Sequence, residues 1–312
     1  MMIRTENLSK RFGDVVAVKD LNLEVRKGTA YGFIGPNGAG KSTTMAMLAT
    51  LLEPSEGRAW IGGWEVTEHP DEVRRLIGYM PDFFGVYDRL TAEEYLAFFA
   101  AGYGIDPSRR EGIISRLLEL VNLADKRDAY VDDLSRGMKQ RLGLARCLVH
   151  DPELLILDEP ASGLDPRARI ELRSVLRELK SMGKTIFISS HILPELADFC
   201  DAIGVMERGK LVAAGDVREI TGRIKGGRTV EIHLLEDAER AAKRLEGEQG
   251  VTSLRVDGRK LTVGLEGDER RQAELLSLLI AEGIPVYRFE EISTDIEDVF
   301  LKITGTGEEG SP

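Results

Sequence analysis

The chain has 312 residues, of which 42% are hydrophobic, so it is long enough to bury a large core and to form two domains. Its net charge of −11 disfavours non-specific nucleic-acid binding, and its two cysteines, which lack paired spacing, disfavour a disulfide or zinc framework. No run approaches the roughly 18 consecutive apolar residues of a membrane span, and the first ten residues lack the apolar core of a signal peptide. We therefore expect a cytoplasmic protein.

The first part of the chain predicts short strands that lead into a phosphate-binding loop. Residues 15–18 and 21–25 read as separate strands, the apolar run 30–34 as a buried strand, and residues 43–52 as a helix. Between the last two, the sequence Gly-Pro-Asn-Gly-Ala-Gly-Lys-Ser-Thr fits the pattern G-x-x-x-x-G-K-[ST]. A strand before this pattern and a helix after it are the context that the motif requires.

Each kind of residue in this loop suits the binding of phosphates. The glycines let successive backbone N–H groups turn towards a phosphate chain, and the dipole of the following helix points the same way. The Lys41 side chain, which we expect to be solvated, adds a positive charge, and the Ser42 hydroxyl can ligate Mg²⁺. The predicted nucleotide-binding residues of the loop are Gly35, Asn37, Gly38, Ala39, Gly40, Lys41, Ser42 and Thr43.

The middle of the chain predicts helices. Between residues 82 and 131 the apolar residues recur at helical spacing, and residues 95–99 and 113–121 supply the apolar faces. A further helix starts at Ser135.

Two acids follow the next predicted strand. The apolar run 154–157 predicts a buried parallel strand, and Asp158 stands at its carboxyl end, where open α/β sheets bind ligands. There Asp158 can hold the hydration shell of Mg²⁺, and Glu159 can polarise a water for attack on a γ-phosphate. A solvated turn is the alternative, and the phosphate loop upstream disfavours it. The strands that complete the sheet are predicted at residues 185–189, 202–206 and 210–213.

In this order and spacing the motifs resemble the ATP-binding subunit of an ABC transporter, over about residues 1–220. The resemblance implies an α/β P-loop NTPase fold with an antiparallel β subdomain and a helical subdomain at about residues 83–150. It identifies residues 35–43 as the Walker A loop, residues 154–158 as the Walker B strand and Glu159 as the catalytic glutamate.

Three further residues take their roles from the resemblance. It implies that Asp165 belongs to the D-loop that contacts a partner protomer, and that His191 senses the γ-phosphate. It also implies that Phe12 stacks on adenine, with simple packing as the alternative for this residue.

Two departures from the family pattern bear on the mechanism. Residues 134–138 read Leu-Ser-Arg-Gly-Met where the family has Leu-Ser-Gly-Gly-Gln, so Ser135 and Gly137 still offer a hydroxyl and N–H groups to a γ-phosphate across a dimer. The capping contact of the glutamine is lost at Met138.

Asp82 stands where the family has a glutamine that contacts metal or attacking water, and its carboxylate keeps the oxygen ligand but adds a negative charge. A solvated aspartate in a turn is the alternative, and the effect of Asp82, Arg136 and Met138 on coupling stays open.

After a linker at residues 222–228, a second domain is predicted at residues 221–312. Its elements follow the order β-α-β-β-α-β, which predicts a ferredoxin-like α+β fold. Residues 294–301 resemble the tail of ATPases that serve exporters of drugs, lipids or polysaccharides, with a purely structural cap as the alternative. The strands are expected at residues 229–235, 254–256, 260–265 and 285–289, the helices at 238–245 and 271–281, and the last strand precedes the segment 296–303.

The resemblance therefore implies an ATP-hydrolysing subunit that binds ATP and Mg²⁺ and dimerises around two ATP molecules, as a homodimer or with a related ATPase. It is expected to power export through a separate integral membrane permease, as a cytoplasmic protein peripheral on the inner face of the cell membrane, with no nucleic-acid partner. The alternative is a soluble ABC ATPase that acts on nucleic acid or ribosomes. It is disfavoured because no long coiled coil separates Lys41 from Asp158 and only one cassette is present.

Overall fold

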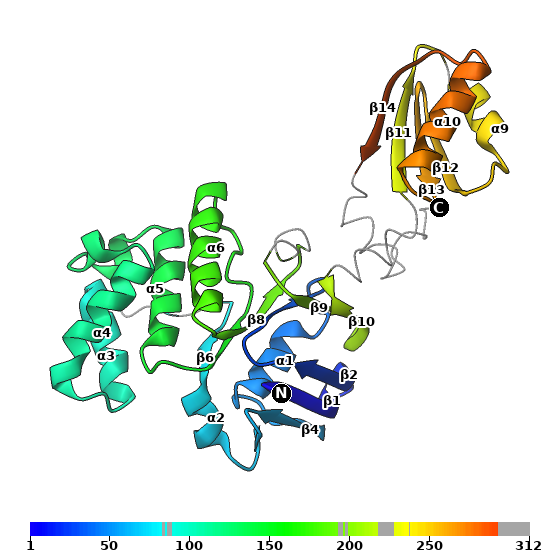
Figure 1. Ribbon diagram of the computed structural model, residues 1–312. Helices are drawn as coiled ribbons and strands as arrows, with labels where there is room; N and C mark the ends of the chain where they lie inside the picture. Colours follow the sequence, from blue (N-terminus) through cyan, green and yellow to red (C-terminus); the bar gives the residue numbers. More distant parts are fainter. Residues whose placement is uncertain are drawn as a thin grey trace. The chain divides into compact units, whose positions relative to one another are not determined.

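The computed structural model describes residues 1–82, 85, 89–192, 196, 199–217, 228–236 and 238–292. The chain divides into two compact units, Met1–Val217 and Arg218–Pro312, each with its own hydrophobic core (Figure 1). The domain boundary expected at residue 220 and the expected tail at residues 294–301 both lie outside the described residues.

A six-stranded sheet forms the centre of the first unit, in the order β10-β9-β3-β8-β7-β6. All neighbouring strands are parallel except β10, which pairs with β9 in the antiparallel direction. Every residue of β3, β7 and β8 is buried, which explains why the segments of β3 and β7 read as continuous apolar runs in the sequence. The strands are β3 (Ala30–Ile34), β6 (Ile77–Met80), β7 (Leu154–Leu157), β8 (Thr185–Ser190), β9 (Ala202–Glu207) and β10 (Lys210–Asp216).

A second, antiparallel sheet has the order β2-β1-β4-β5. The two strands expected at residues 15–18 and 21–25 are one strand, β2, because the interruption between them is a register irregularity at which Asp20 takes a φ of 50°. The core of the unit joins this sheet to α1 and to the central sheet. The strands are β1 (Ile3–Phe12), β2 (Val15–Val25), β4 (Glu56–Ile61) and β5 (Trp64–Glu65).

The helices of the first unit lie around the central sheet. The helix expected at residues 43–52 begins earlier, directly after Gly40, and ends earlier, because Thr50 takes a left-handed φ of 61°. Helices α3, α4 and α5 pack against one another in the region expected to be the helical subdomain, and α6 lies beside α5 (Figure 1). The helices are α1 (Lys41–Leu48), α2 (Pro70–Leu76), α3 (Ala92–Gly102), α4 (Pro107–Leu120), α5 (Arg136–Leu148) and α6 (Pro166–Ser181).

One buried arginine ties three of these helices together. Arg141 of α5, whose side chain is 7% exposed, donates from Nη1 to the backbone oxygens of Val121 (2.8 Å) and Asn122 (2.9 Å), directly after α4. Its Nη2 lies 3.1 Å from Oε2 of Glu171 on α6. The arginine therefore satisfies backbone acceptors at the end of α4 and the charge of a glutamate on α6.

The second unit has the element order β11, α9, β12, β13, α10, β14. Its four strands form an antiparallel sheet in the order β12-β13-β11-β14, which confirms the expected β-α-β-β-α-β arrangement. The alternating residues Val230, Ile232 and Leu234 of β11 belong to its buried core. The elements are β11 (Arg228–Leu234), α9 (Glu239–Leu245), β12 (Val251–Asp257), β13 (Lys260–Leu265), α10 (Glu269–Ala281) and β14 (Val286–Ile292).

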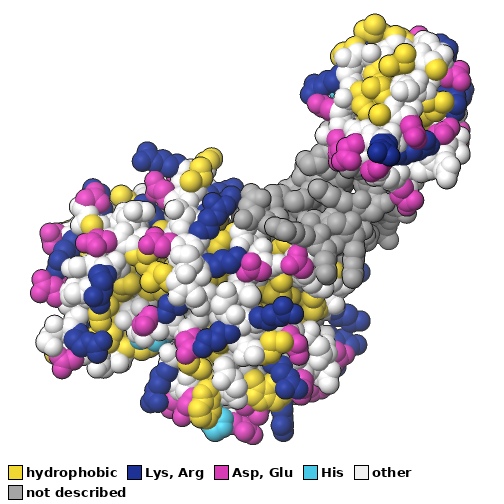
Figure 2. Space-filling model, viewed as in Figure 1, with side chains coloured by type: hydrophobic (Ala, Val, Ile, Leu, Met, Phe, Trp, Pro, Cys, Tyr) yellow, Lys and Arg dark blue, Asp and Glu magenta, His cyan; other side chains and the backbone are white. Residues whose placement is uncertain are grey.

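Two surface properties bear on function. Acidic and basic side chains are interspersed over the viewed face of the first unit (Figure 2). Among the described residues, no helix has both the length and the apolar character that crossing a bilayer requires.

Candidate functional site

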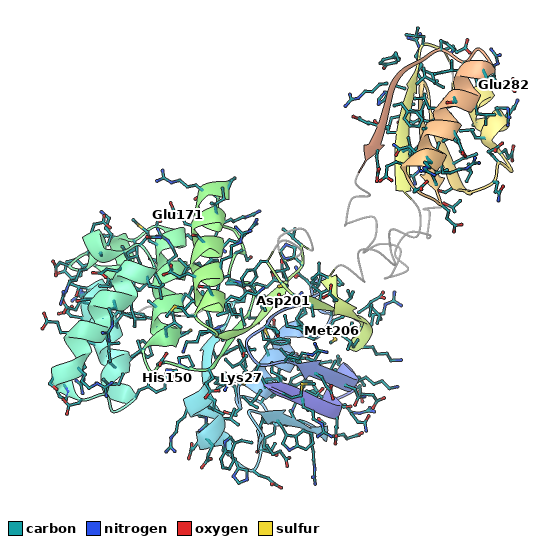
Figure 3. The ribbon with its side chains drawn as sticks, viewed as in Figure 1. Lys27, His150, Glu171, Asp201, Met206 and Glu282 are labelled. Atoms are coloured by element: carbon teal, nitrogen blue, oxygen red, sulfur yellow. The ribbon has the colours of Figure 1, made fainter. Side chains whose placement is uncertain are left out.

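The phosphate-binding loop lies between β3 and α1. Gly40, the last residue before α1, has a φ of 102°, and a Cβ there would overlap the backbone oxygen of Ala17 in β2. The side chain of Met206 in β9, labelled in Figure 3, would also meet that Cβ, because its Cε lies 3.2 Å from the Cβ position. No side chain caps the start of α1, so its first backbone N–H groups are available to an anion held by the loop.

Lys41 is buried inside this loop, with a side chain that is 5% exposed. Its ammonium group donates to the backbone oxygens of Gly35 (2.6 Å) and Pro36 (3.2 Å) and lies 3.3 Å from Oε1 of Glu159. The expectation that this side chain is solvated is therefore wrong. The loop folds its carbonyl groups around the ammonium group, and a carboxylate from a distant strand completes its surroundings.

The acids Asp158 and Glu159 follow β7, and a serine from the neighbouring strand holds both. Asp158 is 2% exposed, and its Oδ1 accepts a hydrogen bond of 2.7 Å from the Ser189 hydroxyl. The backbone N–H of Glu159 donates to the same Ser189 oxygen at 2.8 Å. Sequence reasoning missed Ser189; its only signal is a polar residue at the end of an apolar strand.

The carboxylate of Glu159 joins the phosphate loop to a histidine. One oxygen faces Lys41, and the other lies 2.8 Å from Nδ1 of His191. Glu159 has a φ of 48°, a left-handed conformation that costs a non-glycine residue on the order of 1–3 kcal/mol and that surrounding contacts must enforce. Glu159 and His191 also line a cavity of about 150 Å³ together with Gly163. A carboxylate in this position can accept a proton from a water beside the loop.

Asp82 follows β6, next to these acids. Burial, together with the charges of Asp158 and Glu159, raises the pKa of the Asp82 carboxyl, while Arg136 and Lys41 oppose the increase. Asp82 therefore lies within the electrostatic field of the site although its side chain is exposed.

The chemistry of the donor set fits a magnesium ion. Asp158 is a buried carboxylate, Asp82 is a carboxylate beside it, and Ser42 is an exposed hydroxyl at the start of α1. These are the oxygen ligands that Mg²⁺ prefers.

Other expected site residues lie at the starts of helices, where their contacts are structural. Ser135 caps α5 by accepting a hydrogen bond from the backbone N–H of Met138 at 3.3 Å, so this half of the cap survives the absence of the glutamine. A Cβ at Gly137 would lie 2.7 Å from the Cβ of Ala168, so the glycine lets α5 approach α6. Asp165 caps α6 by accepting hydrogen bonds from two backbone N–H groups.

Phe12 lies at the end of β1, and it is 50% exposed. The Lys10 ammonium group lies 5.3 Å from the centroid of its ring. Phe12 pairs with Val15 at the start of β2, the strand that contacts the phosphate loop at Ala17. Phe12 is therefore half exposed, and Lys10 approaches its ring.

A second cluster of ionisable groups lies on the sheet of the other unit. Ligand-type atoms of Glu231, His233 and Glu290 lie within 4.8 Å of one another. Glu231 already accepts from His233 (2.6 Å) and pairs with Lys260 (2.5 Å), and Glu290 pairs with Arg288 (2.7 Å). These partners account for the cluster as a surface network of charges.

Comparison with known proteins agrees with this geometry. The family model described as "ABC transporter" matches residues 18–162, and the model described as "ATP-binding protein DrrA1-3-like, C-terminal domain" matches residues 215–304. The chain is 36% identical over 299 residues to the Nod factor export ATP-binding protein I of Burkholderia orbicola, which covers 96% of this chain and 95% of the relative. It is 37% identical over 309 residues to the bacitracin transport ATP-binding protein BcrA of Bacillus licheniformis, with 98% of both chains covered.

A solved structure shares the fold of the first unit. The dimeric structure of MJ0796, described as a bacterial ABC transporter cassette, superposes with a TM-score of 0.64 and 26% identity. The match covers 70% of this chain and 99% of that cassette.

Proposed function

The chain belongs to the ATP-binding subunits of ABC transporters, ATPases that couple ATP hydrolysis to transport, and from this premise we propose how its site works. The protein binds ATP with Mg²⁺, closes as a head-to-tail dimer over two nucleotides, and powers export through a separate permease at the inner face of the cell membrane. The similarity to a protein named for Nod factor export and to one named for bacitracin transport supports export as the direction.

The observation that carries the proposal is the set of contacts around Glu159. Its carboxylate faces the lysine of the phosphate loop through one oxygen and His191 through the other, and Ser189 holds its backbone. In this arrangement Glu159 is the general base that takes a proton from the attacking water, and His191 orients the carboxylate.

The phosphate loop and the neighbouring acids bind the rest of the nucleotide. Lys41 and the first N–H groups of α1 bind the phosphates, and Phe12 offers its exposed ring face to adenine. Ser42, Asp158 and Asp82 would hold Mg²⁺, which supplies positive charge to the phosphate oxygens when bound.

The starts of α5 and α6 serve the nucleotide of the partner protomer. The Ser135 side chain is exposed at the start of α5, where a helix begins with available N–H groups. Gly137 lets this helix start approach α6, and Asp165 fixes the first turn of α6. The cassette of MJ0796, whose solved structure is dimeric, supports this arrangement.

A groove between α3, α5 and the sheet is the proposed docking surface for the permease. It has a volume of about 260 Å³ and is lined by apolar and basic side chains, among them Leu51, Tyr79, Phe99, Tyr103 and Arg146. Leu51 is 65% exposed, which suits an apolar contact that a partner covers. Because Tyr79 belongs to β6, the strand that leads to Asp82, the groove lies close in the chain to the hydrolysis site.

The alternative, an ATPase that acts on nucleic acid, requires a concentrated basic surface. The interspersed charges on the viewed face of the first unit do not favour it (Figure 2).

The first experiment tests hydrolysis with Glu159→Gln. The amide cannot take the proton, so turnover should fall by about 10²-fold or more while ATP binding is kept. Size-exclusion chromatography with Mg²⁺ and ATP should then show a stable dimer. A variant that hydrolyses at the wild-type rate and stays monomeric would exclude the role of Glu159.

The second experiment tests the groove with Leu51→Glu. The charge should abolish copurification of the permease from detergent extract and leave the ATPase activity of the isolated subunit unchanged. Met182→Glu, which changes a similarly exposed apolar residue after α6, is the matched control and should keep the permease. Equal copurification of the permease with both variants would show that the permease docks on another surface.

A further inference from the structure

The turn between β9 and β10 packs against the phosphate-binding loop. It is a two-residue turn, Arg208-Gly209, because Glu207 pairs directly with Lys210. Both turn residues have positive φ angles, 46° and 80°, a pattern typical of type I′ hairpin turns. The backbone N–H of Gly209 donates a hydrogen bond of 3.0 Å to the backbone oxygen of Ala39. The turn therefore holds one carbonyl group of the phosphate-binding loop.

Strand β2, which contacts both α1 and β10 (Figure 1), takes part in the same junction. The backbone N–H of Lys19 donates a hydrogen bond of 2.8 Å to the backbone oxygen of Gly209. A Cβ at Gly209 would lie 2.9 Å from the backbone oxygen of Ala17, and a Cβ at Gly40 would lie 2.4 Å from the same oxygen. The two glycines thus let the turn and the loop approach one carbonyl group of β2, and the three segments contact one another through their backbones.

The hydrogen bond to Ala39 fixes the direction of the next N–H group. The carbonyl of Ala39 and the N–H of Gly40 belong to one peptide unit, which is trans. A trans peptide unit is planar, and its C=O and N–H groups point in opposite directions. Because the carbonyl points to the turn at Gly209, the N–H of Gly40 points away from that turn.

We propose that Gly209 is a positioning residue for ATP binding, because its N–H holds the Ala39 carbonyl and so directs the N–H of Gly40 towards the phosphates. This role rests on the proposed function of the loop as the ATP site. An N–H group that is fixed before the ligand binds loses little further freedom, and its hydrogen bond to a charged phosphate is stronger than one between neutral groups. The turn therefore contributes to phosphate affinity although it lies outside the phosphate-loop motif.

The turn between β4 and β5 offers a matched control. It is also a two-residue turn, Gly62-Gly63, and its φ angles are 59° and 94°. A Cβ at Gly63 meets no atom within 4 Å, so Gly63→Ala introduces backbone strain alone. Gly209→Ala introduces the same kind of strain, and it also pushes the turn away from Ala17, which lengthens the hydrogen bond to Ala39.

The test measures the affinity of the full chain for ATP and for inorganic pyrophosphate by isothermal titration calorimetry. Gly209→Ala should weaken the binding of both by about tenfold or more, which is the effect of losing a hydrogen bond to a charged group. An equal loss for pyrophosphate, which has no base, locates the defect at the phosphates. The KM for ATP should rise by the same factor and kcat should change by less than about twofold, because the lost contact is present in the ground state and the transition state alike.

Gly63→Ala should keep the wild-type affinities although its unfolding midpoint falls. Unchanged affinities in Gly209→Ala, or equal losses in the two variants, would overturn the role of Gly209. If Gly209→Ala does not fold, nuclear magnetic resonance of the wild type decides. The amide proton of Gly40 should move downfield when pyrophosphate is added, and an unchanged chemical shift would overturn the role.

These outcomes are distinct from failure of the proposed function. A wild-type protein that does not bind ATP would refute the function of the loop and, with it, the role of the turn. A wild-type protein that binds ATP, together with a Gly209→Ala variant that binds it equally well, would refute the role of the turn alone.

Discussion

Replacing Ser189 by alanine should destabilise the protein and slow hydrolysis, because one hydroxyl holds both acids of the site. The substitution removes hydrogen bonds of 2.7 Å to Asp158 and 2.8 Å from the Glu159 N–H. A buried polar group that loses its partner costs about 1–3 kcal/mol, and the charged Asp158 lies at the upper end of that range. We expect a total of about 3 kcal/mol, which lowers the unfolding midpoint of a domain of this size by about 6–12 °C. The freed backbone of Glu159 should lower turnover by about 10–100-fold, because small misplacements of a reacting group have effects of this size.

The assay compares Ser189→Ala with Thr185→Val on the same strand. Thr185 is fully buried at the other end of β8, where its hydroxyl accepts a hydrogen bond from the Gly28 N–H. Thr185→Val should therefore lower the midpoint and leave turnover unchanged. Equal losses of turnover in the two variants would show that only stability is affected, and wild-type behaviour of Ser189→Ala in both assays would refute the reasoning.

Two other predictions concern packing and pH. Gly137→Ala should destabilise the protein by about 1–3 kcal/mol, because the new methyl group meets Ala168. Chemical denaturation measures this loss, and an unchanged denaturation midpoint would show that α5 can move away from α6. His150 stacks on Tyr103, and burial lowers the pKa of its imidazole. The neutral form therefore stabilises the fold above the unfolded pKa of about 6.5. This stability is lost as the pH falls through the folded pKa. His150→Phe should therefore lose less stability than the wild type between pH 7.5 and 5.5, and parallel curves would contradict this.

Local patterns predicted the parts of the fold that depend on neighbours in sequence. The strands at residues 30–34 and 154–157 have the expected bounds, because continuous apolar runs between turn residues are typical of buried parallel strands. The interruption near Asp20 was misread as a gap between two strands, because a register irregularity keeps the ladder intact while it breaks the alternation of apolar residues.

The site residues that sequence reasoning missed or misjudged depend on contacts between distant segments. The buried Lys41 lies beside Glu159, which follows β7, and β8 separates β7 from β3 in the sheet, so no local pattern indicates this contact. The role of Ser189 requires the parallel pairing of β8 with β7, which no local pattern encodes. Arg136 was recognised as a departure from the family pattern, but its contact with Gly163 comes from the packing of α5 onto the turn before α6.

The contacts of Arg141 link α5 to α6. To separate α5 from α6, the arginine must leave Glu171 (Figure 3) while it stays buried, and uncompensated buried charges of this kind cost about 3–5 kcal/mol. We therefore expect α5 and α6 to move together when the helical subdomain is displaced, with Arg141 also linked to the backbone after α4. Because Arg136 begins one helix and Asp165 caps the other, we expect a displacement of the two helices to move both helix starts together.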